Sequence, residues 1–179
     1  VAYRPNGSLL YKNTSWAVYH DVDPAPTGDA TVEYVASGLA DPSRCDADRC
    51  SLSVIERVNL TTGEVERLWS RAKPDMGSDD VHDVDRINAT HHAVADIYLD
   101  RVFVIDVSED EIVWTWNASD AFPRDSGGPY PSDWTHINDV EVLPDGRFMV
   151  SVRNQDRVVF VEAGEGLQEE WTLGEEDDY

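Results

Sequence analysis

The sequence predicts an all-β fold, a β-propeller built from four-stranded antiparallel blades, with about three blades present. Three observations predict it: a short motif occurs three times, longer segments recur at matching spacings, and no segment has the periodicity of an amphipathic helix. Units of four short strands that repeat along a chain are typical of propellers. A β-sandwich is the alternative, although that fold does not require a repeated unit.

The repeats can be read directly from the printed sequence. HDVD stands at His20–Asp23 and again at His82–Asp85, and NDVE at Asn138–Glu141 follows the same pattern. At the spacing between the last two, DRVFVID aligns with DRVVFVE, and VNLTTGEVERLW of the first copy matches IDVSEDEIVWTW of the second. We therefore expect residues 1–179 to be part of a single propeller, with repeats at approximately 16–75, 78–122 and 133–175.

The third repeat has the clearest strand signals. PDG and NQD are turn sequences, and the segments between them are rich in Val, Phe and other residues that favour strands. Its four predicted strands are Asn138–Leu143, Arg147–Arg153, Arg157–Glu162 and Gln168–Leu173. Because each blade buries its faces against its neighbours, three blades would leave two apolar faces for further blades or another protein to cover.

The charge of the chain is extreme, at −22, and lysine occurs only at Lys12 and Lys73 among 14 basic residues. An acidic, lysine-poor surface stays hydrated in molar salt, where the Debye length is about 3 Å and self-repulsion costs little. We therefore expect a halophilic protein; an acidic mesophilic protein is the alternative. Such a charge argues against binding to nucleic acid or to anionic membranes. No apolar run approaches the roughly 20 residues that span a bilayer.

Two features favour a location outside the cytoplasm, either extracellular or at the cell surface. Cys45 and Cys50 lie close enough to bridge a small loop, and a disulfide suits them better than a zinc site with two thiols and no nearby histidine. Five of the seven asparagines begin N-x-Ser/Thr sequons for N-glycosylation, and these are Asn6, Asn13, Asn59, Asn88 and Asn117. Because the sequence starts without Met and stops abruptly, we expect a processed or partial version of a longer chain.

The candidate functional residues are His136, Asn138 and Arg153. The start of the first strand and the end of the second meet at one end of a hairpin, so these three side chains are expected together. Two donors and a guanidinium suit a tetrahedral oxyanion such as sulfate or phosphate. In the second repeat Asp80 and Ile97 stand where the third has His136 and Arg153, so the trio does not recur as a structural residue should. Ordinary hydrogen bonding at a blade corner and a metal site are the alternatives.

Other polar residues are weaker candidates. His20 and His82 occupy the position of Asn138 in the other repeats and would face the same channel, although a packing role is an equal alternative. Ser78–Asp80 and Glu175–Asp178 could bind calcium, but hydrated surface is the preferred interpretation in so acidic a protein. We expect no metal site and no cofactor.

The segment DWTHINDVEVLPDGRFMVSVRNQDRVVFVE resembles the arylsulfotransferase (ASST) propeller family, and specifically its haloarchaeal members. The match rests on His-x-Asn, a turn and then Ser-x-Arg, here His136, Asn138, Ser151 and Arg153. The HDVD segment that begins at His82 is also similar to segments that precede a repeat in that family.

The resemblance implies a six-bladed propeller, of which this chain would form half. It further implies transfer of a sulfuryl group between phenols through a sulfated histidine, without a nucleotide sulfate donor. His136, Asn138 and Arg153 would hold the sulfuryl oxygens and His82 would line the same pocket, while the sulfated histidine of the family belongs to a later blade. The partners would be aryl sulfates and phenols. The alternative is a non-catalytic, glycosylated cell-surface propeller that acts in binding or assembly.

Overall fold

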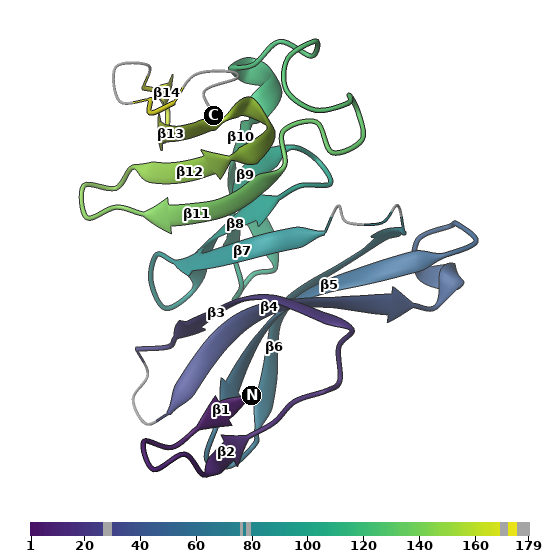
Figure 1. The fold of residues 1–179 in the computed structure, drawn as a ribbon, viewed down its shortest axis with the longest axis vertical. Helices are drawn as coiled ribbons and strands as arrows, with labels where there is room; N and C mark the ends of the chain where they lie inside the picture. The colour runs from purple at the N-terminus through teal and green to yellow at the C-terminus, as the bar shows by residue number, and fades with distance from the viewer. Residues whose placement is uncertain (27–29, 76, 78–79, 169–171, 175–179) are drawn as a thin grey trace. The chain divides into compact units, whose positions relative to one another are not determined.

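The computed structural model describes residues 1–179 except 27–29, 76, 78–79, 169–171 and 175–179. In the described residues the chain is all-β, with three four-stranded antiparallel sheets and one two-stranded sheet (Figure 1). The only helical segments in that part are three short 3-10 turns, as the sequence predicts, and none is long and apolar enough to cross a membrane. The chain divides into two compact units, Val1–Asp75 and Met76–Tyr179, and each is described by itself.

The first unit contains the first four-stranded sheet, which has the strands in sequence order, and a small hairpin. The hairpin is β1 (Ala2–Tyr3) and β2 (Leu9–Tyr11); the sheet is β3 (Val18–Pro24), β4 (Thr31–Ala40), β5 (Cys50–Asn59) and β6 (Val65–Pro74). A disulfide joins Cys45 to Cys50 across the turn between β4 and β5, which confirms the predicted bridge.

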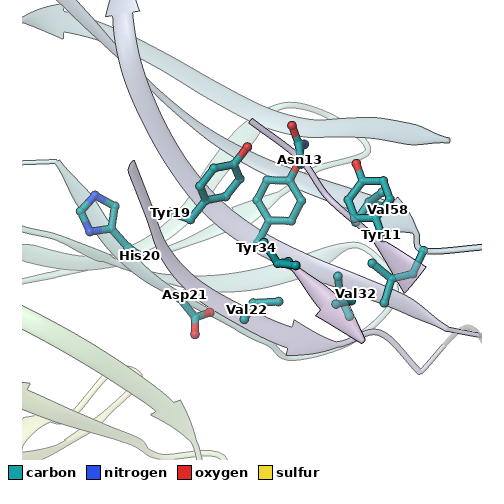
Figure 2. Close-up of a pocket in the computed structure, with 12 residues that line it drawn as sticks. Tyr11, Asn13, Tyr19, His20, Asp21, Val22, Val32, Tyr34 and Val58 are labelled. Carbon is teal, nitrogen blue, oxygen red and sulfur yellow. The ribbon is translucent and has the colours of Figure 1, made fainter. Parts of the chain in front are cut away.

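A buried carboxylate organises one side of this sheet. Glu56 is 4% exposed and accepts hydrogen bonds from the Tyr34 hydroxyl at 2.6 Å and the Trp16 indole at 2.9 Å. The Arg67 guanidinium completes the cluster at 2.7 Å. Tyr34 also forms one wall of a pocket of about 210 Å³, where its ring lies beside those of Tyr11 and Tyr19 (Figure 2).

The second unit holds the other two four-stranded sheets, again with the strands in sequence order. The second sheet is β7 (Val81–Arg86), β8 (His91–Asp96), β9 (Arg101–Asp106) and β10 (Glu111–Asn117). The third is β11 (Ile137–Val142), β12 (Phe148–Val152), β13 (Arg157–Glu162) and β14 (Gly166–Leu167). Each of the three predicted repeats therefore contains one such sheet, and the exact limits of the repeats stay a prediction.

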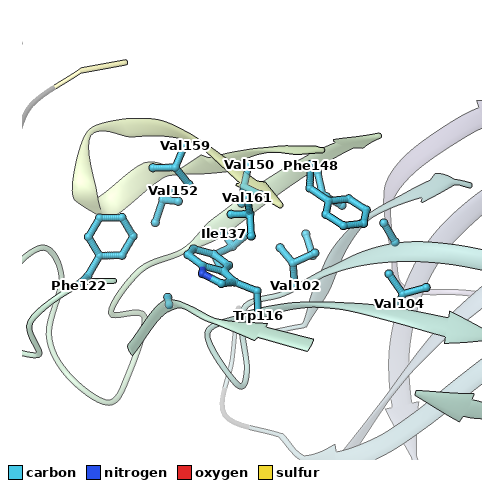
Figure 3. Packing of buried hydrophobic residues seen from close by; sticks show 14 of the residues in the cluster. Val102, Val104, Trp116, Phe122, Ile137, Phe148, Val150, Val152, Val159 and Val161 are labelled. Atoms are coloured by element: carbon cyan, nitrogen blue, oxygen red, sulfur yellow. The ribbon is translucent and has the colours of Figure 1, made fainter. Parts of the chain in front are cut away.

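The second and third sheets share one hydrophobic core. Alternate residues of β12 and β13, such as Val150 and Val159, point toward Val102 and Trp116 of the second sheet (Figure 3). Side chains of a strand alternate between its two faces, so this packing commits one face of each sheet to the core. The two sheets of this unit thus lie face to face.

The last strand of the third repeat differs from the prediction. The structure has β14 at Gly166–Leu167, where the sequence predicts a strand over Gln168–Leu173. Two glycines with positive φ, Gly164 and Gly166, form a tight turn that returns the chain to β13 earlier than expected. Leu173 still forms an isolated bridge with Val158, and the Trp171 of the predicted strand lies outside the described residues.

All three sheets carry an irregularity at the same position of the repeated motif. The register of the first strand shifts at His20, at His82 and at Asn138, each of which is the first residue of HDVD or NDVE. A β-bulge inserts one extra residue and changes the direction of the side chains next to it. The motif therefore encodes a bulge at the start of each first strand.

The two aspartates that follow His82 explain the acidic half of the motif. The carboxylate of Asp83 accepts the backbone N–H of Val140 at 2.8 Å, and that of Asp85 accepts the N–H of Val142 at 2.5 Å. These N–H groups lie on the edge of β11 that is not paired with β12. Carboxylates of one sheet thus satisfy the edge of the next.

Replacement of Asp83 by alanine should lower the free energy of unfolding of the second unit by about 2 kcal/mol, because the Val140 N–H would stay buried without an acceptor. Urea denaturation followed by tryptophan fluorescence measures this loss. Asp145→Ala removes an exposed carboxylate from the turn after β11 and serves as the control. Equal stability of the two variants would contradict the assigned role of Asp83.

Candidate functional site

The structure brings the predicted pair His136 and Arg153 together at one end of the β11–β12 hairpin. The backbone N–H of Arg153 donates to the carbonyl oxygen of His136 at 3.3 Å, and the next pair along the ladder is Ile137 with Val152. The placement does not come from regular strand geometry, however. His136 precedes β11 with a left-handed φ of 49°, and Asn138 lies in the bulge, so neither occupies a regular strand position.

His136 is buried and is held from two sides. Its Nδ1 lies against the carboxylate of Asp133, and its ring meets that of His82 edge to face, with 5.3 Å between the ring centroids. A carboxylate on Nδ1 favours the tautomer that carries its proton there and leaves Nε2 as the free nitrogen. The two predicted histidines, His82 of β7 and His136 just before β11, therefore share one site.

Arg153 reaches the same aspartate from the exposed side. Its Nη2 lies 3.4 Å from the second carboxylate oxygen of Asp133, and its Nε donates to the side chain of Asn154 at 3.0 Å. Asp133 thus lies between the imidazole and the guanidinium. The sequence prediction did not include Asp133, although its position three residues before His136 puts it within reach.

A second carboxylate, that of Asp100, holds the segment between Asp133 and His136. The Thr135 hydroxyl and its N–H, the latter at 3.1 Å, both donate to Asp100 in the turn between β8 and β9. Burial raises the pKa of Asp100 despite these hydrogen bonds, and the carboxylates of Asp96 and Asp133 add to the rise. Asp100 therefore takes up a proton at higher pH than an exposed aspartate.

The loop before His136 is clamped onto the 3-10 turn Arg153–Gln155. Asn154 donates from its side chain to the carbonyl oxygen of Asp133 at 2.6 Å and from its backbone N–H to Thr135 at 3.0 Å. Gly128 packs so closely here that a Cβ atom would collide with the Asp133 carbonyl oxygen and the Asn154 amide. The Gly-Gly pair in SGGPY is the sequence signal for this clamp.

Asn138 is a predicted site residue whose side chain makes no hydrogen bond to His136, Arg153 or His82 in the described chain. Its side chain is half-buried and makes no hydrogen bond to the described residues. A shallow depression of about 350 Å³ is lined by Ser151, Arg153 and Arg157 among others. The Nε of Arg157 is buried without a hydrogen-bond partner in the described chain. Two guanidiniums and a hydroxyl are groups that bind oxyanions.

Among the remaining candidates, His20 belongs to the first unit. His20 lines the pocket of the first unit, and its Nε2 is 3.4 Å from the Ser37 hydroxyl. No group of three metal-ligating side chains occurs in the part of the chain that the structure describes, and most of the two runs weighed for calcium falls outside that part. The structure thus offers histidines, an aspartate and arginines as its reactive groups.

The predicted sequons differ in accessibility. Asn6, Asn88 and Asn117 are exposed, whereas Asn13 and Asn59 are half-buried. The Asn13 amide also donates to the Tyr34 hydroxyl at 3.0 Å, so the nitrogen that would carry a glycan is already engaged. The three exposed asparagines are therefore better placed for modification.

Comparison with known proteins identifies the family. The family model described as "Arylsulfotransferase (ASST)" matches residues 11–179. A search of curated proteins found no match. Among solved structures, the chain is similar to "KlHsv2 with loop 6CD replaced by a Gly-Ser linker", with 11% sequence identity and a TM-score of 0.42. That similarity covers 70% of this chain and 36% of the other. Since the family model matches nearly the whole sequence, the chain belongs to the arylsulfotransferase (ASST) family.

Proposed function

We propose that this chain is about half of a six-bladed β-propeller that transfers a sulfuryl group between phenolic compounds through a histidine. Family membership supports an arylsulfotransferase-like function in general. The single observation that carries the specific proposal is the contact between His82 and His136 beside Asp133 and Arg153. The face-to-face sheets of the second unit support the stacked arrangement of blades.

The chemistry follows from the groups present. An aryl sulfate carries three sulfuryl oxygens whose charge rises as the bond from sulfur to the aryl oxygen breaks. Arg153, and the imidazole N–H groups where they carry a proton, can donate to those oxygens, and fixed donors of this kind contribute about 3 kcal/mol each. Asp133 holds the His136 ring in one orientation. The entropic cost of fixing that ring is therefore met in folding and does not add to the activation barrier.

Transfer through a histidine has two balanced steps. A neutral imidazole nitrogen attacks sulfur, the bond from sulfur to the aryl oxygen breaks, and the phenolate leaves and takes up a proton. The oxygen of a second phenol then attacks the same sulfur, loses its proton, and the bond between sulfur and nitrogen breaks. Because the first phenol leaves before the second reacts, ping-pong kinetics are expected.

Replacement of His136 by alanine should lower the rate of transfer by at least about 100-fold. The assay uses a chromogenic aryl sulfate as donor and a second phenol as acceptor, in molar salt. His91→Ala is the matched control, because His91 contacts Thr90 and Asp106 away from the site. Equal rates for the His136 variant and the unmodified protein would overturn the assigned site.

The second candidate function is a non-catalytic, glycosylated cell-surface propeller that acts in binding or assembly. Its support is the set of exposed sequons and the Cys45–Cys50 disulfide, which also favour a protein outside the cytoplasm. The acidic, lysine-poor composition separately favours a halophilic protein. Failure of the unmodified protein to transfer sulfuryl groups, with glycans found on Asn6, Asn88 or Asn117 by mass spectrometry, would favour this candidate.

A further inference from the structure

Residues 118–136 form a long connection between β10 and β11, and both of its ends are attached to Asp100. At the start, the Ala118 N–H donates to the carbonyl oxygen of Asp100 at 2.9 Å. At the end, the Thr135 hydroxyl and N–H both donate to Oδ1 of the Asp100 side chain. Connections longer than about 15 residues with little regular structure are uncommon in compact units, and ordered ones usually serve a function. One residue of the second sheet therefore closes the loop that ends at His136.

The hold on Thr135 is complete. Thr135 is fully buried, and Asp100 accepts both of its donors. The backbone N–H of Asn154 donates to its carbonyl oxygen at 3.0 Å. Because a buried polar group that loses its partner is costly, Thr135 has little freedom to move away from these partners. One of them belongs to the second sheet and the other to the turn after β12, so Asp100 fixes the loop relative to the second sheet.

The backbone on both sides of Thr135 has an unusual conformation. Asp133 and His136 have left-handed φ values of 56° and 49°, and Asp100 itself has a φ of 48°. Residues other than glycine seldom adopt this region, and they stay in it only where surrounding contacts hold them there. The hydrogen bonds of Thr135 are such contacts. Without them, the chain from Asp133 to His136 can relax toward an ordinary φ, which changes the direction of the imidazole.

The contact between the two histidines depends on the same attachment. His82 belongs to β7 of the second sheet, whereas His136 precedes β11 of the third. Asp100 holds the chain one residue before His136, and Asp83 holds β11 through the Val140 N–H at 2.8 Å. His136 thus lies between two attachments to the sheet that carries His82. These attachments set the 5.3 Å between the two ring centroids.

We infer that Asp100 is a positioning residue of the site, which acts through Thr135 to hold the His136 ring in place. The inference rests on the proposed function, because it concerns the same site. The Asp100 carboxylate accepts from Thr135 and not from the imidazole, so its effect is indirect. A reacting group that is displaced by about 1 Å can lose about 100-fold in rate, which is why such an indirect contact matters.

Three variants separate the carboxylate from the backbone conformation. Asp100→Gly removes the carboxylate and tolerates the φ of 48°. Asp100→Asn keeps an oxygen that can accept both hydrogen bonds, and asparagine also tolerates this φ. Asp110→Gly is the matched control, since Asp110 is an exposed aspartate with a φ of 55° in the turn between β9 and β10.

Nuclear magnetic resonance of ¹⁵N-labelled histidine is the first readout, because it shows which ring nitrogen of each of the five histidines carries a proton. The spectra are recorded at alkaline pH, where imidazoles are neutral, and His136→Ala identifies the His136 signals by their loss. In the unmodified protein and in Asp110→Gly, His136 should carry its proton on Nδ1. In Asp100→Gly it should exchange between both tautomers, and in Asp100→Asn the single tautomer should return. This readout needs no transfer activity.

The chromogenic transfer assay is the second readout. The kcat of Asp100→Gly should fall at least about tenfold, whereas Asp100→Asn and Asp110→Gly should stay within about twofold of the unmodified protein. Near-ultraviolet circular dichroism shows whether each variant is folded. If Asp100→Gly is not, Thr135→Val decides in its place. That variant removes only the hydroxyl and should shift both readouts in the same direction.

An unchanged His136 tautomer or an unchanged kcat in folded Asp100→Gly would overturn the inference. So would a loss in Asp100→Asn as large as that in Asp100→Gly, because the amide oxygen replaces the acceptor. If the unmodified protein transfers no sulfuryl group, the proposed function fails, and the tautomer of His136 alone then decides whether Asp100 orients the ring.

Discussion

Trp134→Ala should lower the free energy of unfolding of the second unit by about 4 kcal/mol, the largest single effect expected in this chain. The Trp134 side chain is 1% exposed and belongs to the shared core of the second and third sheets. Its indole N–H also donates to the carbonyl oxygen of Ser126 at 2.8 Å. Because Trp134 lies between Asp133 and His136, its loss should also release the site loop.

Urea denaturation followed by circular dichroism measures this effect. Trp134→Phe keeps most of the ring and loses the hydrogen bond, so it should cost about 1–2 kcal/mol. Tyr130→Ala is the control, because Tyr130 is 47% exposed although its ring meets that of Trp134. A loss below about 1 kcal/mol for Trp134→Ala would show that this indole does not hold the two sheets together.

Glu56→Gln should lower the free energy of unfolding of the first unit by about 3 kcal/mol at neutral pH. The variant removes the charge of the buried Glu56, leaves the Arg67 guanidinium without its anionic partner and weakens the hydrogen bonds from Tyr34 and Trp16. Glu66→Gln is the matched control, since the exposed Glu66 pairs with Arg57 on the opposite face of the same sheet, and its loss should cost under about 0.5 kcal/mol.

The effect of Glu56 also has a definite dependence on pH. Burial by itself raises the pKa of Glu56, but the hydrogen bonds from Tyr34, Arg67 and Trp16 outweigh it and bring the pKa below its ordinary value of 4.5. A carboxylate with a lowered pKa stabilises the fold fully above the unfolded value and loses that contribution as the pH falls through the folded value. The difference between the unmodified protein and Glu56→Gln should therefore shrink below about pH 4.5. A difference that stays constant down to pH 3 would contradict this assignment.

Much of the fold could be predicted because it depends on local patterns. The turn sequences PDG and NQD, the segments rich in Val and Phe between them and the recurring HDVD motif predicted where the first three strands of the third repeat lie to within a residue or two. The last described strand, Gly166–Leu167, begins two residues before the predicted one, because the glycines at 164 and 166 decide where the chain turns back.

The candidate site could be predicted only in part. The hairpin alone places His136 beside Arg153, and the family resemblance points to His82. Asp133, Thr135 and Asn154 escaped notice because their roles depend on contacts between the loop, the turn after β12 and the preceding sheet. Nothing in the local sequence marks Asp100 as the acceptor for Thr135.

The amino-acid sequence by itself determined the all-β character, the threefold repetition of a four-stranded unit, the disulfide and the family of this protein. Each of these follows from residue types at short spacings, where side-chain alternation, turn preference and loop closure act on neighbouring residues. Only the tertiary structure decided that the motif carries a bulge, that Asp83 and Asp85 satisfy the edge of the next sheet, and that Asp133 lies between His136 and Arg153. A hydrogen bond between groups far apart in the chain depends on packing of whole sheets, and no local pattern reports that packing.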